Sequence, residues 1–219
     1  MNILFVVAMQ KEANKIIEHY NLKKQKENFY QKENISLIIT DIGRNNVTIN
    51  LLELTKTYNI KEAIIINIGL TGSNNLNIGE IVEINNSYGY HFDLTPFGDK
   101  LYHTTNSPFK LDTINELKLI DCYTSDRFVQ ETNIKETCVF DMELNAITLF
   151  PHKKIHSIKI VSDTLNANTY NEFNYDEAIQ KSLIYSDKII SSYQNWYELI
   201  FNPINYKDKH QTQLIHKYN

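Results

Sequence analysis

Cysteine, glycine and proline are scarce in this chain of 219 residues, which contains two, six and four of them. The two cysteines, Cys122 and Cys138, are too few for a disulfide framework and fit no metal-ligand spacing. The glycines and prolines do not cluster, so no stretch indicates an interdomain linker. We therefore expect a protein of the reducing cytoplasm without a metal or other cofactor, built as one domain over residues 1–202 with a polar tail over residues 203–219.

An excess of positive charge is also missing, and so is any long apolar run. Lysine and arginine number 22 against 26 aspartates and glutamates, a formal net charge of −4 that does not favour binding to nucleic acid. The apolar residues 3–9 are interrupted at once by Lys11 and Glu12, unlike a signal peptide. No run approaches the ~20 residues that a membrane-spanning helix needs. We expect neither nucleic acid nor a membrane among the partners.

What the sequence does contain is an alternation of strand-like and helix-like segments. Short apolar runs predict strands buried on both faces at residues 3–8, 37–39, 63–66 and 158–161. Apolar residues at helical spacing predict core-facing helices at residues 45–58, 142–150 and 175–200. Residues 79–97 are rich in tyrosine, isoleucine and valine and predict two further strands. The predicted architecture is a three-layer α/β/α sandwich around a central mixed, curled sheet.

Polar residues follow four of the strand-like runs, and ligands bind at such strand ends in open α/β sheets. These groups lie at residues 9–12, 67–72, 124–128 and 162–163. Each group also has an ordinary explanation. Glu12 fits the first turn of a helix, Asp163 fits a cap, and Gly69 with Gly72 fits a tight turn. Taken singly, none of the groups identifies a function.

Two histidines, His152 and His156, have the four-residue spacing of a helical metal pair. They follow Pro151 and run directly into a predicted strand. We therefore interpret them as a solvated connection rather than as metal ligands.

Six segments in order along the chain carry a family resemblance. They are Ala-Met-Gln-Lys-Glu (8–12), Asp-Ile-Gly-Arg (41–44), Tyr-His-Phe-Asp-Leu-Thr-Pro-Phe-Gly (90–98), Ser-Asp-Arg-Phe-Val (125–129), Asp-Met-Glu (141–143) and Val-Ser-Asp (161–163). Together they resemble the 5′-methylthioadenosine/S-adenosylhomocysteine nucleosidases of the purine nucleoside phosphorylase superfamily, over about residues 3–195. The resemblance implies a nucleoside phosphorylase-like fold, a homodimer, no cofactor, and hydrolysis of a purine nucleoside in methionine salvage.

The resemblance also implies roles for single residues. Asp163 looks like the general acid that protonates the departing base through N7, and Ser162 would help to fix it. Glu12 looks like the carboxylate that orients the attacking water. Glu143 would hold the ribose hydroxyls, and Met142 would pack under the sugar.

The remaining implied site residues surround the base and the 5′-substituent. Phe128 would stack on adenine while the backbone of Val129 reads its edge. Phe97 resembles the aromatic residue that family dimers lend to the neighbouring subunit. Lys159 stands where the family usually has an arginine that helps to hold the water. The predicted substrate-binding set is completed by Met9, Thr71 and Gly72.

Cleavage of an N-glycosidic bond needs two carboxyl groups with different duties. The sugar becomes electron-poor, so the base must leave protonated while water approaches the opposite face. The acid must keep its proton near neutral pH, which burial favours, whereas the other carboxylate must stay ionised. We assign the first duty to Asp163 and the second to Glu12.

Three alternatives stay open. Related phosphorylases use phosphate, but they carry an arginine and a serine where this chain has Asn67 and Leu70, which leaves Arg44 and Lys159 as candidate cations. A nucleoside-binding protein without turnover is a second possibility, although keeping several buried carboxylates without a task costs stability. A flavodoxin-like or dinucleotide-binding domain is the third, but the first strand is not followed by Gly-x-Gly-x-x-Gly. We prefer water as the nucleophile.

Overall fold

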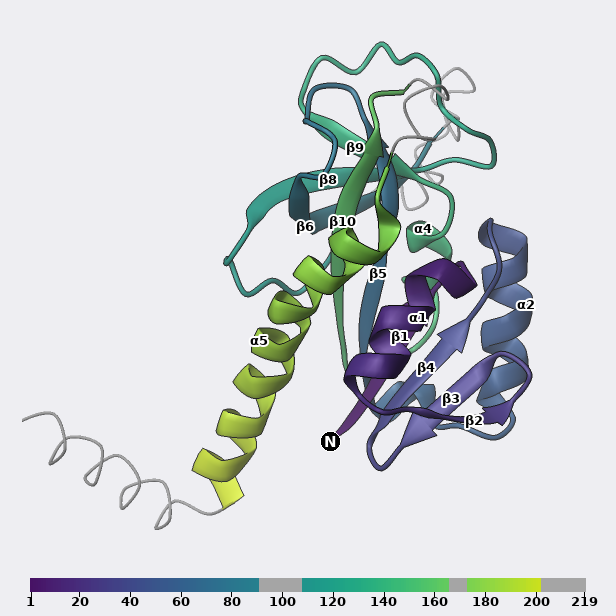
Figure 1. Cartoon of the computed structure of the whole chain (residues 1–219), viewed down its shortest axis with the longest axis vertical. Helices are drawn as coiled ribbons and strands as arrows, with labels where there is room; N and C mark the ends of the chain where they lie inside the picture. The colour runs from purple at the N-terminus through teal and green to yellow at the C-terminus, as the bar shows by residue number, and fades with distance from the viewer. Residues whose placement is uncertain (91–107, 166–172, 202–219) are drawn as a thin grey trace, which may run out of the picture. The chain divides into compact units, whose positions relative to one another are not determined.

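The computed structural model describes residues 1–90, 108–165 and 173–201 (Figure 1). The chain consists of two compact units, Met1–Leu183 and Ile184–Asn219. The first unit contains the whole described sheet and every described residue of the predicted site. The predicted tail over residues 203–219 and the predicted site residue Phe97 lie outside the described residues. The domain boundary at residue 202 therefore stays a prediction.

Three parallel strands form the centre of the sheet: β1 (Asn2–Val7), β4 (Ile35–Ile39) and β5 (Ala63–Ser73). In register, Ile3 of β1 lies opposite Ile35 of β4 and Ile64 of β5. The last five residues of β1 are completely buried, which is why this strand is apolar at consecutive positions rather than at alternate ones. Beyond β4, the antiparallel strands β3 (Phe29–Lys32) and β2 (Lys23–Lys26) complete this edge.

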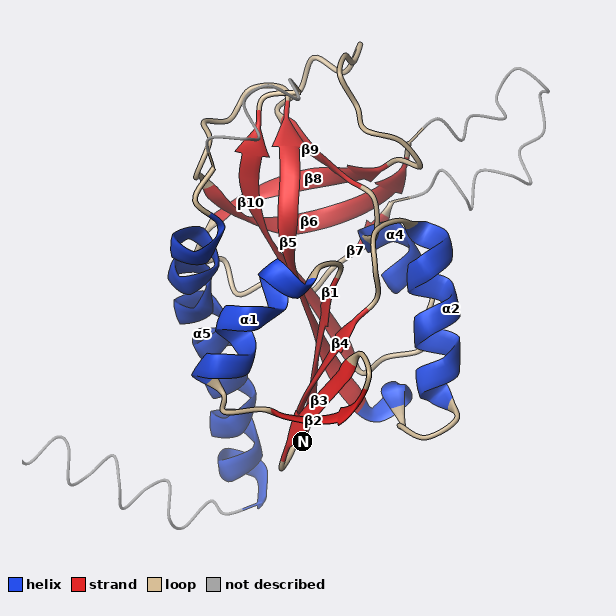
Figure 2. Ribbon diagram, turned by 45° about the vertical axis from the view of Figure 1, so that its right-hand side comes forward, coloured by secondary structure: helices blue, strands red, loops and turns tan. Residues whose placement is uncertain are grey.

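The other half of the sheet curls into a closed ring of five strands. Its members are β5, β9 (Cys138–Asp141), β8 (Lys118–Thr124), β6 (Ile81–Gly89) and β10 (Lys154–Asp163). The ring closes because β10 pairs with β6 in an antiparallel ladder and with β5 in a parallel one. The short strand β7 (Phe109–Lys110) pairs antiparallel with β6 and is not a member of the ring. The mixed, curled sheet predicted from the sequence is confirmed (Figure 2).

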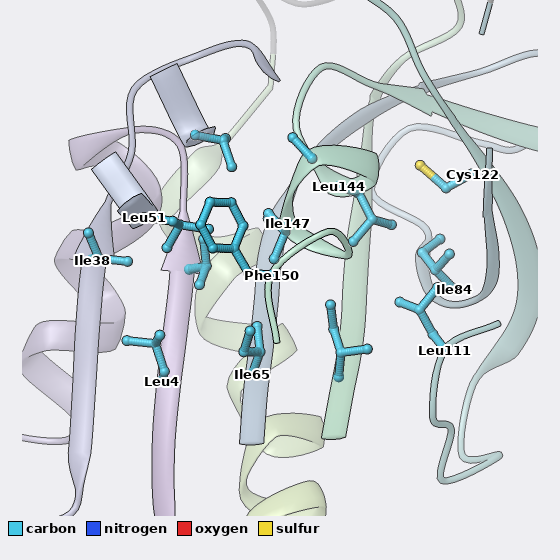
Figure 3. Close-up of a cluster of buried hydrophobic side chains, with 14 of the residues drawn as sticks. Leu4, Ile38, Leu51, Ile65, Ile84, Leu111, Cys122, Leu144, Ile147 and Phe150 are labelled. Atoms are coloured by element: carbon cyan, nitrogen blue, oxygen red, sulfur yellow. The ribbon is translucent and has the colours of Figure 1, made fainter. Parts of the chain in front are cut away.

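Helices cover both faces of the central strands. Figure 2 shows α1 (Gln10–His19) on one side and α2 (Arg44–Thr55) with α4 (Leu144–Ile147) on the other. A short 3-10 helix, Ile60–Glu62, leads into β5, and α5 (Tyr175–Phe201) ends the described chain. The main core lies between the sheet and the α2–α4 layer, where Leu51, Ile147 and Phe150 pack near Leu4 and Ile65 (Figure 3). None of the described helices is both long and apolar enough to cross a membrane.

Several sequence-based boundaries are corrected by the structure. The helix expected over residues 142–150 is a single turn, and Leu149 beyond it is exposed. Residues 67–72 do not form a turn after a strand, because β5 continues through them to Ser73 and pairs with β9 and β10 there. The solvated connection expected at His156 is also wrong. His156 is buried within β10, with its Nδ1 3.8 Å from the Glu83 carboxylate on β6.

Candidate active site

A cavity of about 290 Å³ opens where β1, β5 and β10 end, at the edge of the sheet at which ligands of open α/β folds bind. Its walls come from five of the six segments that carried the sequence motifs, all but residues 90–98, together with residues 70–72 of β5. The lining residues are Ala8, Met9, Glu12, Ile42, Leu70, Thr71, Gly72, Phe128, Phe140, Asp141, Met142, Glu143, Ser162 and Asp163. Nine of the twelve predicted site residues are among them.

Glu12 lies in the first turn of α1, with only 2% of its surface exposed. One carboxylate oxygen accepts hydrogen bonds from the backbone N–H groups of Ala8 and Met9, both at 2.9 Å, and therefore caps its own helix. The other oxygen accepts the N–H of Leu70 on β5 at 3.0 Å. Burial raises the pKa of Glu12, while these three N–H groups and the charge of Lys159 oppose the rise.

Asp163 ends β10, lines the same cavity and is also 2% exposed. Its Oδ2 accepts the hydroxyl of Ser162 at 3.0 Å, and its Oδ1 accepts the N–H of Leu165 at 3.1 Å. Burial raises the pKa of Asp163, against the effect of these two hydrogen bonds. The β5–β10 register shifts between Val161 and Asp163, which is a bulge, and as a result both Ser162 and Asp163 line the cavity.

Two glycines of β5 give these carboxyl groups their space. A Cβ atom on Gly72 would stand 2.8 Å from Oδ1 of Asp163, which is closer than real contacts allow. A Cβ on Gly69 would stand 3.3 Å from a carboxylate oxygen of Glu12 and 3.3 Å from the ammonium of Lys159. The tight turn that the sequence suggests at Gly69 and Gly72 is absent, because both residues lie within β5. At these two positions the missing side chain leaves room for the carboxyl groups of Glu12 and Asp163.

Lys159 does not line the cavity but lies behind its wall, 1% exposed on β10. Its Nζ is 2.7 Å from Oδ2 of Asp141, which is buried as well. Burial opposes the charge of Lys159, but Asp141 and Glu143 raise its pKa above the ordinary value. Asp141 does line the cavity, and the sequence reasoning did not select it.

The remaining lining residues include those expected to contact the sugar and the base. Glu143 accepts the backbone N–H of Gly43 at 2.9 Å, and burial, followed by the charge of Asp141, raises its pKa to about 7. Met142 lies beside it in the lining. Phe128 lines the mouth of the cavity, while Val129 lines a smaller adjoining hollow of about 30 Å³.

An ion pair spans two of the loops that shape the mouth. Arg44, at the start of α2, donates from Nε to Oδ1 of Asp126 at 2.7 Å and from its terminal nitrogen to Oδ2, a bidentate arrangement. Arg44 directly follows the loop that contains Ile42, and Asp126 precedes Phe128. The pair therefore ties together the chain segments that carry two exposed apolar residues of the lining.

Within the described ranges, no cluster of three or more His, Cys, Asp or Glu side chains has the arrangement of a metal site. Thr71, which was predicted to bind substrate, lines the cavity, and its hydroxyl donates to the carbonyl of Phe140 at 2.6 Å. The place of Phe97 stays a prediction.

Comparison with known proteins gives a clear result only at the level of three-dimensional structure. No protein-family model matches the chain, and no curated protein sequence matches it. Among solved structures, a protein of Borrelia burgdorferi assigned as a 5′-methylthioadenosine/S-adenosylhomocysteine nucleosidase and bound to adenine has 24% identity and a TM-score of 0.70, over 85% of this chain and 98% of that one.

Two further nucleosidases of the same kind superpose similarly. The Neisseria meningitidis enzyme in complex with methylthio-immucillin-A has 20% identity and a TM-score of 0.68, over 82% of this chain and 94% of that one. A mutant of the Helicobacter pylori enzyme with 5′-methylthioadenosine in its active site has 15% identity and a TM-score of 0.71, over 87% and 98%. The chain therefore has the nucleoside phosphorylase-like fold of the methylthioadenosine/adenosylhomocysteine nucleosidases, as the sequence motifs predicted.

Proposed function

We propose that this chain hydrolyses the N-glycosidic bond of 5′-substituted adenosines of the methylthioadenosine and adenosylhomocysteine type, releasing adenine. The observation that carries the proposal is the pair of buried carboxyl groups, Glu12 and Asp163, that line one cavity. Solved structures with the same fold hold adenine, 5′-methylthioadenosine and methylthio-immucillin-A.

Asp163 is the general acid in this proposal. Its raised pKa favours the protonated form that can donate to N7 of the base, and the Ser162 hydroxyl fixes the orientation of its carboxyl group. Protonation neutralises the charge that develops on the base as the bond to C1′ breaks. The departing adenine then leaves as a neutral molecule.

Glu12 is the residue that orients and activates water. Three backbone N–H groups hold its carboxylate, and the Lys159 ammonium flanks the same space beside Gly69. These groups favour the ionised form and oppose the rise in pKa that burial causes. Water bound to this carboxylate approaches C1′ from the face opposite the base. Glu143 accepts hydrogen bonds from the ribose hydroxyls and fixes the sugar between the two carboxyl groups, with Met142 packed beneath it.

Phe128 and Val129 provide the base site. The ring of Phe128 offers a stacking surface at the cavity mouth. The smaller hollow, which Val129 and Phe140 share with Asp163, receives the edge of the base that carries N7.

Water is preferred over phosphate because the two candidate cations, Arg44 and Lys159, already have partners. Arg44 is paired with Asp126, and Lys159 with Asp141. Asn67, at the position where phosphorylases have an arginine, donates to the carbonyl of Val6 and accepts the hydroxyl of Ser157. A phosphate dianion would need cationic and hydroxyl donors that are free to bind it.

We also propose a homodimer in the cytoplasm. Ile49 and Leu52 lie three residues apart on α2 and are 65% and 54% exposed, and Leu149, next to the adjacent α4, is 76% exposed. Such side chains suit a contact between copies of the chain. Multi-angle light scattering measures the mass, and a monomer at micromolar concentration contradicts the proposal.

The decisive experiment is product analysis with methylthioadenosine, adenosylhomocysteine, adenosine and inosine, each with and without phosphate. We expect free adenine and a 5′-substituted ribose at rates that phosphate does not change. A Glu12→Gln/Asp163→Asn double variant, purified identically, reports any contaminating host nucleosidase. Phosphate-dependent release with formation of a sugar phosphate would instead identify a phosphorylase, and tight binding without base release would identify a binding protein.

A further inference from the structure

We infer that Asp141 is a positioning residue that sets both the nucleophile side and the sugar side of the active site, an inference that rests on the proposed nucleosidase function. Asp141 ends β9, is 5% exposed, and contacts three different elements. Its Oδ1 accepts the hydroxyl of Thr124 on β8 at 2.6 Å. Its Oδ2 accepts the N–H of Leu144 in α4 at 3.0 Å and lies 2.7 Å from the ammonium of Lys159 on β10.

The contact with Lys159 acts on the nucleophile side. Lys159 lies in register with Gly69 of β5, and the space left by the missing Gly69 side chain is flanked by the Lys159 ammonium and a Glu12 oxygen. A buried ammonium without a partner would move towards the nearest carboxylate, since an unpaired buried charge is very unfavourable. By binding Lys159, Asp141 keeps that charge beside Glu12 while the carboxylate of Glu12 stays on its three backbone N–H groups.

The contact with Leu144 acts on the sugar side. It satisfies an N–H group at the start of α4, directly after Glu143. Thr124, which holds the other oxygen of Asp141, also accepts the N–H of Asn145 in the same turn. Asp141 and Thr124 together fix this turn, and the turn presents Glu143 and Met142 to the cavity.

The charges around Asp141 predict in which direction its neutralisation would shift the ionisation of Glu143 and Glu12. The groups that face Glu143 are Asp141, Lys159 and Glu12, and the buried thiol of Cys122 faces Lys159 from β8. Burial raises the pKa of that thiol well above its ordinary value, which keeps it neutral. Neutralising Asp141 would remove a negative charge near Glu143 and leave Lys159 uncompensated near Glu12. Both changes favour ionised carboxylates.

The test is Asp141→Asn, with Asp112→Asn as a matched control. Asp112 also pairs with a lysine of β10, Lys154, at 2.6 Å and also accepts a backbone N–H, that of Ile155, but it lies away from the cavity. In Asp141→Asn, kcat/KM for methylthioadenosine should fall on the order of 10²-fold, and the acid limb of its pH profile should move to lower pH. The control should change neither. An unmoved acid limb with activity within a few-fold of wild type overturns the inference.

Two further variants cover other outcomes. Thr124→Val keeps the charge of Asp141 and removes one of its hydrogen bonds, so even if Asp141→Asn fails to fold, kcat/KM should fall several-fold with the acid limb unmoved. If Asp141 and Lys159 act as a unit, Asp141→Asn combined with Lys159→Met should lose no more activity than the worse single variant. Fully additive losses, or a Thr124→Val enzyme like wild type, contradict the inference.

The proposed function can fail separately. In that case the wild-type protein releases no base, and calorimetric binding of methylthio-immucillin-A still tests Asp141. Asp141→Asn should then weaken that binding at least tenfold relative to Asp112→Asn, and equal affinities would overturn the positioning role.

Discussion

Replacing Gly72 by alanine tests whether Asp163 works only in its observed position. Ordinary van der Waals contact begins at 3.4 Å, whereas the added methyl group would lie 2.8 Å from Oδ1 of Asp163, so the oxygen must retreat by about 0.6 Å. The methyl group would also lie 3.2 Å from a side-chain carbon of Leu165, whose N–H donates to the same oxygen. The strain therefore falls on Asp163, the proposed general acid, and on the loop that holds it.

The size of the effect follows from this displacement. A shift approaching 1 Å in a catalytic group can cost about 10²-fold in rate, and we expect kcat to fall by roughly that factor in Gly72→Ala. Overpacking at a buried site costs about 1–3 kcal/mol of stability. Because ~1 kcal/mol lowers the melting temperature of a protein of this size by about 2–4 °C, the variant should stay folded at assay temperature.

Initial rates of adenine release, measured beside thermal unfolding, separate the two effects. Gly79→Ala is the control, because Gly79 has a φ of +86° but nothing within 4 Å of the added Cβ. That variant should lose about 1–2 kcal/mol through backbone strain alone and keep its turnover. Should Gly72→Ala turn over within a factor of about three of wild type, the placement of Asp163 would not limit catalysis.

Three other predictions concern the acid, the pH dependence and the cavity mouth. Asp163→Asn should lower kcat by roughly 10²-fold or more, and steady-state adenine release with near wild-type turnover would exclude Asp163 as the acid. Because burial and Asp141 raise the pKa of Glu143 from 4.5 to about 7 in the folded chain, the folded state retains a proton that the unfolded state has lost. Stability should therefore fall as pH rises through that window, by up to about 1.4 kcal/mol per pH unit, and thermal unfolding should show a flatter fall in Glu143→Gln; equal slopes would contradict this. In a double-mutant cycle on KM, Arg44→Ala and Asp126→Ala should show a coupling energy of about 0.5–1 kcal/mol. This coupling should become smaller at about 1 M salt. Additive effects on KM at low salt would mean that the ion pair does not hold the cavity mouth.

The apolar strands could be predicted from the sequence because complete burial leaves an unmistakable run of aliphatic residues, as in β1. Strands β2 and β3 could not, since β2 is a fully exposed edge with lysine at three of its four positions. The far end of β5 was equally hidden. Its Gly69 and Gly72 have little strand propensity, and pairing with β10, and with β9 at Gly72, keeps this part of the chain extended.

The same distinction applies to the site. Glu12, Glu143 and Asp163 were selected by motif resemblance, and each lies in the lining of the cavity. Asp141 belongs to the same motif as Met142 and Glu143, but the resemblance gives it no role. Its partner Lys159 is brought to it only by the strand order of the closed ring, which no local pattern encodes.

The bulge at the end of β10 makes the position of Asp163, the proposed catalytic acid, more sensitive to insertions and deletions than to substitutions nearby. Side chains of a regular strand alternate between its two faces, so deleting or inserting one residue between Ile160 and Asp163 would exchange the residue that occupies the cavity wall. Conservative replacements along the same stretch would leave the number of residues, and therefore the position of Asp163, unchanged. Tolerance to single-residue deletions should therefore drop sharply at this point, even where neighbouring substitutions are accepted.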